Sequence, residues 1–237
     1  VTRACMDEKS ILLLCFAQGR FQEMLYQIKC LQEQGKIPSD YLILADGKSG
    51  IKYSFSYAQN KKLGISSEMK NFFPSQIEFV NNKNRQALLH THGKKIIVST
   101  SGMGNFGPAR TYIPEMLPLK NSVIHFSGYT AEGTLGRKLQ ELESGESISI
   151  SGITIPKRAE IYNTSEFSSH AKADELIAFI KKFSDVRSVL VTHGEPKTKE
   201  KFANRVVKET SVNKVGVLGN GYSYRIGPYG IIKSIQD

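Results

Sequence analysis

Two histidines in the last third of the chain have the surroundings of a site that binds a metal or transfers a proton. His193 follows an apolar strand expected over 187–191 and precedes Gly194 and Glu195, and His170 comes immediately before a helix expected over 171–183. Imidazole titrates near neutral pH and binds zinc through either ring nitrogen. Both histidines stand at corners between a strand and a helix, so we expect the rings to face one site. Each one taken alone is also compatible with an ordinary structural role.

The other histidines have less promising surroundings. His90 and His92 would point the same way in a strand, but no Asp-His pair follows, and they stand in a basic loop before a strand over 95–100. We therefore do not expect them to bind a metal. His125 stands inside an apolar strand and is expected to be a core histidine.

Three glycine-rich loops form a second set of candidates, because each follows an apolar strand and leads into a helix. Their candidate phosphate-binding residues are Gly19, Arg20, Gly102, Gly128, Gly133 and Thr134. In an open α/β sheet, ligands gather at the carboxyl ends of the strands, where helix N-termini offer unpaired N–H groups to anions. The alternative is that the glycines only make tight turns. A GxxxxGK[ST] loop is absent from the sequence, which argues against a P-loop nucleotide site.

The elements that would position these residues alternate between strand and helix. Strands are expected over 11–17, 41–45, 95–100 and 122–127, with helices over 21–35, 109–117 and 134–142. Residues 48–90 are expected to be helical and irregular, with a solvated loop over 81–86. This order predicts an α/β fold with an open, mainly parallel sheet and helices on both faces.

The last third has a different pattern. We expect a hairpin over 147–155, a strand over 157–162, a second helix over 197–209 and strands around glycine turns over 214–235. The predicted domains are therefore residues 1–156 and residues 157–237.

Composition limits the partners and the location. The 237 residues carry a net charge of +10, which favours a polyanionic partner such as RNA. Three cysteines without CxxC spacing indicate free thiols in a reducing, cytoplasmic location. The longest apolar run, 11–17, is too short to span a membrane.

Five short motifs, in order, resemble those of the metallo-β-lactamase/β-CASP family of RNA-processing nucleases, which includes ribonuclease J and the cleavage and polyadenylation endonuclease. Residues 19–25 (GRFQEML), 97–103 (IVSTSGM, followed by Gly-Pro at 107–108) and 127–135 (SGYTAEGTL) resemble the motifs of a β-CASP domain. Residues 167–170 (FSSH) and 192–195 (THGE) resemble motifs B and C of the metallo-β-lactamase domain. The resemblance extends over nearly the whole chain. It implies a β-CASP sheet followed by the C-terminal α/β part of a metallo-β-lactamase fold.

The resemblance also implies roles for individual residues. His193 would be a zinc ligand, with His170 and Glu195 as catalytic groups for hydrolysis of a phosphodiester bond assisted by two zinc ions. A histidine in motif C favours single-stranded RNA over DNA as the substrate. The remaining RNA-binding candidates that the motifs imply are Ser101, Met103, Tyr129, Ser168 and Ser169.

The sequence departs from the family pattern in three places. The HxHxDH motif that supplies most zinc ligands is absent, as is the acidic motif A, and Lys172 stands where the family usually has Asp. We therefore expect a chain that begins inside the β-CASP insertion and that alone neither holds catalytic zinc nor cuts RNA. A non-catalytic nucleic-acid-binding module and a nucleotide-binding α/β protein remain as alternatives, and self-assembly of the chain is left open.

Overall fold

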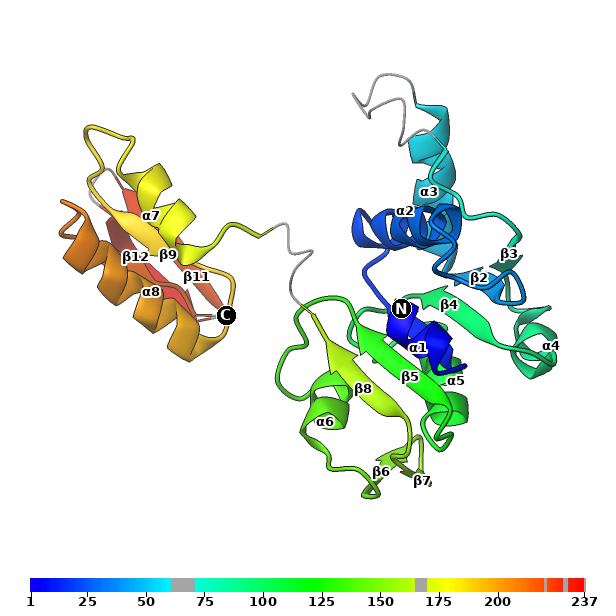
Figure 1. Cartoon of the computed structure of the whole chain (residues 1–237). Helices are drawn as coiled ribbons and strands as arrows, with labels where there is room; N and C mark the ends of the chain where they lie inside the picture. The colour runs from blue at the N-terminus through cyan, green and yellow to red at the C-terminus, as the bar shows by residue number, and fades with distance from the viewer. Residues whose placement is uncertain (61–70, 165–169, 220, 228–229, 237) are drawn as a thin grey trace. The chain divides into compact units, whose positions relative to one another are not determined.

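The computed structural model describes the chain except for residues 61–70, 165–169, 220, 228–229 and 237, and gives no side chains for 230–236 (Figure 1). It divides into two compact units, residues 1–167 and residues 168–237. Each unit has its own hydrophobic core, so each is described by itself. Within the described residues, no helix is long and apolar enough to cross a membrane.

The first unit is built on a six-stranded sheet in the order β3-β2-β4-β1-β5-β8, with every neighbouring pair parallel. The strands are β1 (Ser10–Leu14), β2 (Leu42–Asp46), β3 (Ile77–Val80), β4 (Lys95–Ser99), β5 (Ser122–Phe126) and β8 (Glu160–Asn163). The two central strands, β4 and β1, are almost entirely buried, as expected for continuous apolar runs covered on both faces. The predicted parallel α/β sheet is confirmed.

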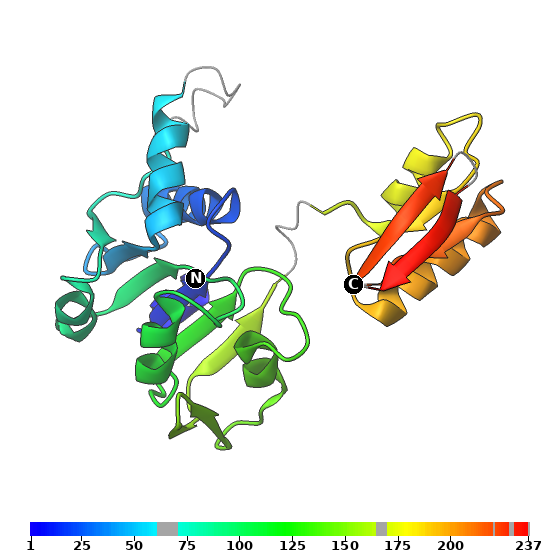
Figure 2. The ribbon, with the colours of Figure 1, turned by 180° about the vertical axis from the view of Figure 1, so that it is seen from behind.

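Helices cover both faces of this sheet (Figures 1 and 2). They are α1 (Thr2–Met6), α2 (Arg20–Glu33), α3 (Lys48–Gln59), α4 (Arg85–His90), α5 (Ala109–Met116) and α6 (Leu135–Glu141). Alternate residues of β1 point to opposite faces. Ile11 and Leu13 share one core with α2, whereas Leu12 and Leu14 share the other with α5 and α6. The core therefore has two layers, one on each side of the sheet.

The segment 48–90 contains more regular structure than the sequence pattern predicts. It holds the helix α3, the edge strand β3 and the short helix α4, whereas the sequence pattern predicts helical and irregular chain without a strand. The predicted solvated loop over 81–86 is wrong at its end, because Arg85 begins α4 and is half-buried. His90 ends that helix instead of lying in a loop.

A hairpin and an edge strand complete the first unit. The predicted hairpin is present as β6 (Ser147–Ile150) and β7 (Ile153–Pro156), which pair antiparallel. The strand expected over 157–162 is β8, and it pairs with β5 as an edge of the main sheet. The predicted boundary after residue 156 assigns this strand to the C-terminal domain, whereas the compact units divide after residue 167. The limits of the family domains stay a prediction.

The second unit packs two helices against two small sheets. Its elements are α7 (Ala173–Ile180), β9 (Val189–Val191), α8 (Pro196–Glu209), β10 (Val215–Val217), β11 (Tyr222–Gly227) and β12 (Gly230–Gln236). β9 and β10 are parallel, and β11 and β12 form an antiparallel hairpin, which faces the viewer in Figure 2 with the helices behind it. The buried core consists of Ile177, Val206 and Val212. Phe179, which the sequence pattern places on the apolar face of α7, is 58% exposed.

Candidate functional site at the sheet edge and at a histidine pair

The three glycine loops open at one edge of the sheet, as the sequence pattern predicts. β1 lies between β4 and β5, and the register pairs Leu14 with Ser99 on one side and with Phe126 on the other. The three strands therefore end level with one another. The loops that follow them carry Gly19, Gly102 and Gly128 and are neighbours in space.

Close packing between the first two loops explains the glycine at position 102. A Cβ atom there would lie 3.2 Å from the carbonyl carbon of Cys15 and 3.2 Å from the backbone nitrogen of Phe16. At Gly128 a Cβ atom would make only an ordinary contact, 3.8 Å from the Phe16 ring. The space beside Gly102 is thus filled by the backbone of the neighbouring loop, and this close packing is one reason for a glycine at this position.

Arg20 connects the first loop to the third. Its Nη1 donates a hydrogen bond of 2.8 Å to the carbonyl oxygen of Ser127, and its side chain is 12% exposed. Gly19, just before it, has a φ of 76°, a conformation that suits glycine. The guanidinium therefore holds the start of α2 against the end of β5.

The N-terminus of α6 connects the third loop to the second. Leu135 N donates to Asn105 Oδ1 at 2.7 Å and Gly136 N donates to the Met103 carbonyl at 2.9 Å. Arg137 N donates to Oγ1 of Thr134, the N-cap residue, at 3.3 Å. The expectation that this helix offers unpaired N–H groups to a phosphate is therefore wrong at α6, although the loop residues themselves stay candidates.

Together these contacts form a closed ring of loops, which we call the loop ring. Gly102 joins the second loop to the first, Arg20 joins the first to the third, and α6 joins the third to the second. Ser101 takes part as well, since its Oγ accepts a hydrogen bond of 3.3 Å from Phe106 N. Gly133, with a φ of 78°, makes the turn before α6. The conformations of the three loops are thus held by contacts within the protein itself.

A buried carboxylate lies at the same edge, at the end of β2, and the sequence analysis did not single it out. Asp46 is 1% exposed and accepts hydrogen bonds from Arg85 Nε at 2.5 Å and Nη2 at 3.0 Å. The Tyr112 hydroxyl donates to the same carboxylate at 2.7 Å, and burial together with this bond raises the Tyr112 pKa. The charge is fully paired, so its evident role is to fasten α4 and α5 to the sheet.

The two candidate histidines of the second unit lie side by side. The ring centroids of His170 and His193 are 6.1 Å apart, with the ring planes inclined by 69°. Both residues are exposed. The expectation that the two imidazoles face one place is confirmed, whereas their placement beside the loop ring is not determined. Ser168 and Ser169 lie outside the described residues.

The backbone at His193 has an uncommon conformation. Its φ is 58°, in the left-handed region, and Gly194 follows with a φ of 126°. Glu195 is the N-cap residue of α8, and Pro196 occupies the first helical position. A non-glycine residue in the left-handed region costs roughly 1 kcal/mol or more and is often found at functional sites. This conformation lies in the short turn from β9 into α8, and the His193 side chain is exposed there.

Two imidazoles fit a zinc centre only in part. Imidazole nitrogen is a good zinc ligand, but zinc takes at least three protein ligands in the usual tetrahedral sites. Across the described parts of the chain, no three His, Cys, Asp or Glu residues are grouped closely enough to hold a metal ion. The described residues therefore offer part of a metal site and do not complete one.

The remaining candidates keep structural roles. His125 is held in β5, where its Nε2 lies 3.1 Å from Thr164 Oγ1, and burial lowers its pKa to about 4. The three cysteines are free thiols, and Cys15 is fully buried. His125 lies in β5 as expected but is half-buried and not part of the core, whereas the cysteines agree with the expected free thiols.

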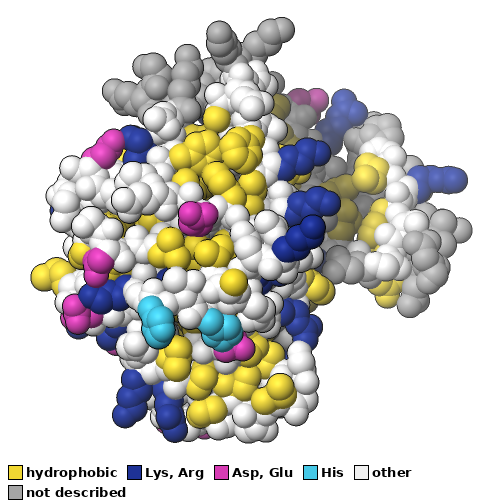
Figure 3. Space-filling view, turned by 90° about the vertical axis from the view of Figure 1, so that its right-hand side faces the viewer, with side chains coloured by type: hydrophobic (Ala, Val, Ile, Leu, Met, Phe, Trp, Pro, Cys, Tyr) yellow, Lys and Arg dark blue, Asp and Glu magenta, His cyan; other side chains and the backbone are white. Residues whose placement is uncertain are grey.

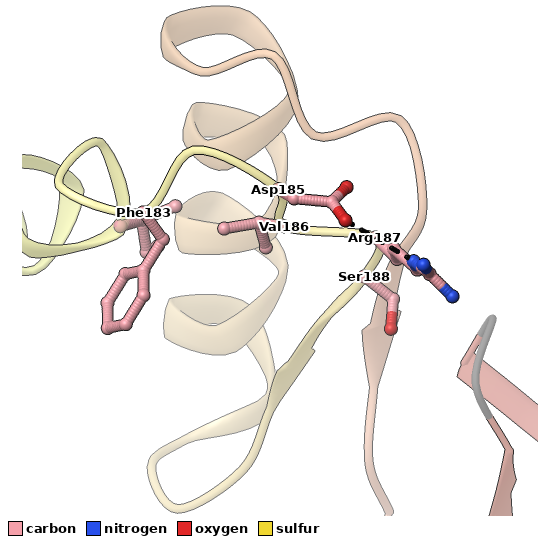
Figure 4. Close-up of a pocket in the computed structure, with 6 residues that line it drawn as sticks. Phe183, Asp185, Val186, Arg187 and Ser188 are labelled. Atoms are coloured by element: carbon pink, nitrogen blue, oxygen red, sulfur yellow. Dashed lines mark ion pairs between the residues drawn. The ribbon is translucent and has the colours of Figure 1, made fainter.

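A hollow of about 460 Å³ in the second unit lies away from the histidines (Figure 4). It is lined by Ile180 and by residues 183 and 185–188, all of which precede β9, whereas His193 follows that strand. Figure 4 shows Phe183 on one side and the Asp185–Arg187 ion pair, 3.6 Å apart, on the other. The hollow is at the opposite end of β9, so it is not part of the candidate site.

Comparison with known proteins identifies the family. Residues 21–139, about half of the chain, match the family model described as the Beta-Casp domain. Residues 154–215 match the model described as the Zn-dependent metallo-hydrolase RNA specificity domain. With the parallel α/β sheet, these matches show that the chain belongs to the metallo-β-lactamase/β-CASP family of RNA-processing nucleases.

Similar proteins carry names from RNA metabolism and transcription. An RNase J-like protein of Methanocaldococcus jannaschii is 31% identical over 85% of this chain and 47% of its own length. The transcription termination factor FttA of the same organism is 29% identical over 83% of this chain and 32% of its own length. An Integrator complex subunit 11 homolog of Dictyostelium discoideum is 28% identical over 86% of this chain and 28% of its own length. The chain thus spans less than half the length of each of these relatives.

Proposed function

We propose that this chain is part of a zinc-dependent ribonuclease that hydrolyses phosphodiester bonds in single-stranded RNA. The observation that carries the proposal is the imidazole pair at the end of β9, with ring centroids 6.1 Å apart. Rings this close can both reach one phosphate group and the metal beside it. The family match to a Zn-dependent metallo-hydrolase domain supports the choice of zinc.

Each residue of the pair has its own task in this proposal. His193 would ligate zinc through one ring nitrogen, and its side chain is exposed in the turn after β9. His170 donates a hydrogen bond to an oxygen of the scissile phosphate and can transfer a proton to or from the reacting groups. Glu195, two residues after His193, is a second group for proton transfer.

Zinc itself would supply a Lewis acid and lower the pKa of a bound water. The described residues do not complete its coordination, so the other ligands must come from outside them. To this chain we assign the orientation of the phosphate and the transfer of protons.

The loop ring is the proposed binding surface for the RNA strand. The net charge of +10 favours an anionic strand, and the second family match is described by its RNA specificity. The proposed contacts are the glycine faces and side chains of the three loops, including Ser101, Met103 and Tyr129. Ser168 and Ser169 are proposed to contact the phosphate beside His170.

A second candidate function is a non-catalytic module that binds RNA. It is favoured by one observation, the absence of an HxHxDH sequence from the 237 residues. The two functions share the RNA-binding surface and differ only in whether the histidine pair takes part in hydrolysis.

The test compares two polypeptides on 5′-labelled single-stranded RNA: residues 1–237 alone, and the product of the complete reading frame that encodes them. We expect both to bind the RNA, and only the second to cut it, in a reaction that chelation of zinc stops. In that second protein, His193→Ala and His170→Ala should each lower cleavage by at least about a hundredfold. Their matched control, His92→Ala, should leave cleavage unchanged.

Two results would count against the proposal. Metal-dependent cleavage by residues 1–237 alone would show that the zinc ligands have been assigned wrongly. RNA binding without cleavage by the product of the complete reading frame would favour the non-catalytic module.

A further inference from the structure

Each of the three loops in the ring carries one exposed aromatic side chain. Phe16 follows β1 and is 48% exposed, Phe106 follows β4 and is 73% exposed, and Tyr129 follows β5 and is 50% exposed. Neighbouring strands lie about 5 Å apart and these three end level, so the rings stand along one edge of the sheet. We call this set the aromatic edge.

The backbone under each ring is held firmly while the ring itself reaches solvent. The backbone of Phe16 packs against Gly102, and the backbone N–H of Phe106 donates a hydrogen bond of 3.3 Å to Ser101 Oγ. The Arg137 guanidinium lies 5.9 Å from the centre of the Tyr129 ring. Exposed rings on a fixed backbone can bind a flat partner with little loss of conformational entropy.

Several other exposed aromatic side chains pack against rings of the protein itself. Phe55 contacts Phe73 and Phe79 with ring centroids 5.5 and 5.1 Å apart, on the α3–β3 side where Figure 3 shows hydrophobic side chains gathered. Phe179 contacts Phe183 in the same way, at 5.1 Å. Neither Phe16 nor Phe106 stacks on another ring within the described residues. The Phe106 ring is therefore available to a ligand, and so is the exposed part of the Phe16 ring, which lies beside Gly102 and Gly128.

We infer that Phe16, Phe106 and Tyr129 stack on unpaired bases of the RNA strand, an inference that rests on the proposed function. Every base has an aromatic face, so stacking of this kind tolerates any sequence. It requires unpaired bases, because a base in a duplex has both faces covered by its neighbours. The aromatic edge would thus select single strands, while the basic residues attract the phosphates.

Fluorescence anisotropy of residues 1–237 with two labelled probes tests the inference. The first probe is a decamer of adenylate, and the second is a decamer of the same ribose–phosphate backbone without bases. We expect the adenylate decamer to bind at least about tenfold more tightly. Phe106→Leu and Tyr129→Leu should each weaken binding of the adenylate decamer by about tenfold and leave the abasic decamer unchanged.

Controls separate loss of stacking from loss of fold. Phe106→Leu alters a side chain that is 73% exposed, so its thermal unfolding should match that of the unmodified chain. Phe179→Leu, an exposed ring in the second unit, should change the affinity for neither probe. Arg110 is exposed in the first turn of α5, directly after the second loop. Arg110→Gln removes a charge there and no ring, so it should weaken binding of both probes equally.

The outcomes distinguish this inference from the function on which it rests. Equal affinity for the two probes, or adenylate binding that both leucine variants retain, overturns the stacking inference and leaves RNA binding intact. Binding of neither probe overturns both.

Discussion

The two units of this protein position their functional residues in different ways. In the first, the candidate residues lie in loops fixed by contacts among themselves, above a sheet with a core on each face. In the second, the histidine pair is exposed at the end of a three-residue strand, in a unit whose central cluster has three buried residues. A binding surface for a long ligand benefits from many supporting contacts, whereas the histidine pair is brought together by two short corners, one before α7 and one after β9. The predictions below test whether the units are as independent as this contrast implies.

The largest expected effect comes from the buried carboxylate of the first unit. Asp46→Ala removes the buried carboxylate that pairs with Arg85 and accepts from Tyr112, and should lower the free energy of unfolding of that unit by about 3–5 kcal/mol. Hydrogen exchange resolved by peptide during urea unfolding would measure each unit separately. Asp174→Ala, the matched loss of an exposed carboxylate bonded to Arg205 in the second unit, should have no measurable effect. Equal destabilisation of both units by Asp46→Ala would show that they unfold as one.

Acid should weaken the first unit through His125. Its pKa is lowered from 6.5 to about 4, so the folded state favours the neutral ring. This contribution to stability is complete above pH 6.5 and is lost as the pH falls from there toward 4, by at most about 1.4 kcal/mol per pH unit. His125→Gln should show a shallower fall over that window in urea titrations. Parallel curves for the two proteins would contradict the assigned role.

Two glycines of the loop ring should respond unequally to the same change. Gly102→Ala places a methyl group 3.2 Å from the adjacent backbone, so we expect a loss of about 1–3 kcal/mol and weaker RNA binding. Gly128→Ala meets only an ordinary contact at 3.8 Å and should leave the stability nearly unchanged. Thermal unfolding of both variants would measure the difference. Similar behaviour of the pair would mean that the loops are not packed as described.

The smallest expected effect tests the turn in the second unit. His193→Gly relieves the left-handed backbone and should make that unit about 1 kcal/mol more stable than His193→Ala does. Both variants lack the imidazole, so both should lose the proposed cleavage activity in the product of the complete reading frame. Peptide-resolved hydrogen exchange measures the stability difference. A glycine variant no more stable than the alanine variant would show that the turn stores no strain.

Local sequence patterns predict much of this architecture and some of the site. The apolar run from Ile11 gives a buried strand, and each glycine loop indicates a strand-to-helix corner, which together imply the parallel sheet. The proximity of His170 and His193 also follows from their places beside neighbouring elements, and the rings do lie together.

Other features depend on long-range packing that a local pattern does not contain. β3 is only four residues long and half-exposed, so its sequence has no clear alternation of apolar and polar residues. The sequence places Phe16 in a buried strand, yet the strand ends at Leu14 and the ring reaches solvent. The pairing of Asp46 with Arg85 joins residues 39 positions apart. The sequence does contain a signal for the aromatic edge, because each of the three glycine loops includes one aromatic residue.

The loop ring has a consequence for how this edge of the protein moves. Each of the three loops contacts the other two, through the packing at Gly102, the Arg20–Ser127 hydrogen bond and the hydrogen bonds of the α6 N-terminus. Movement of one loop away from the sheet would therefore break contacts with both of the others. Fluctuations at the three corners should therefore be correlated, and their amide protons should exchange at similar rates. Binding of an RNA strand to one of the three loops would therefore reduce the backbone fluctuations of the other two, even where the RNA does not contact them.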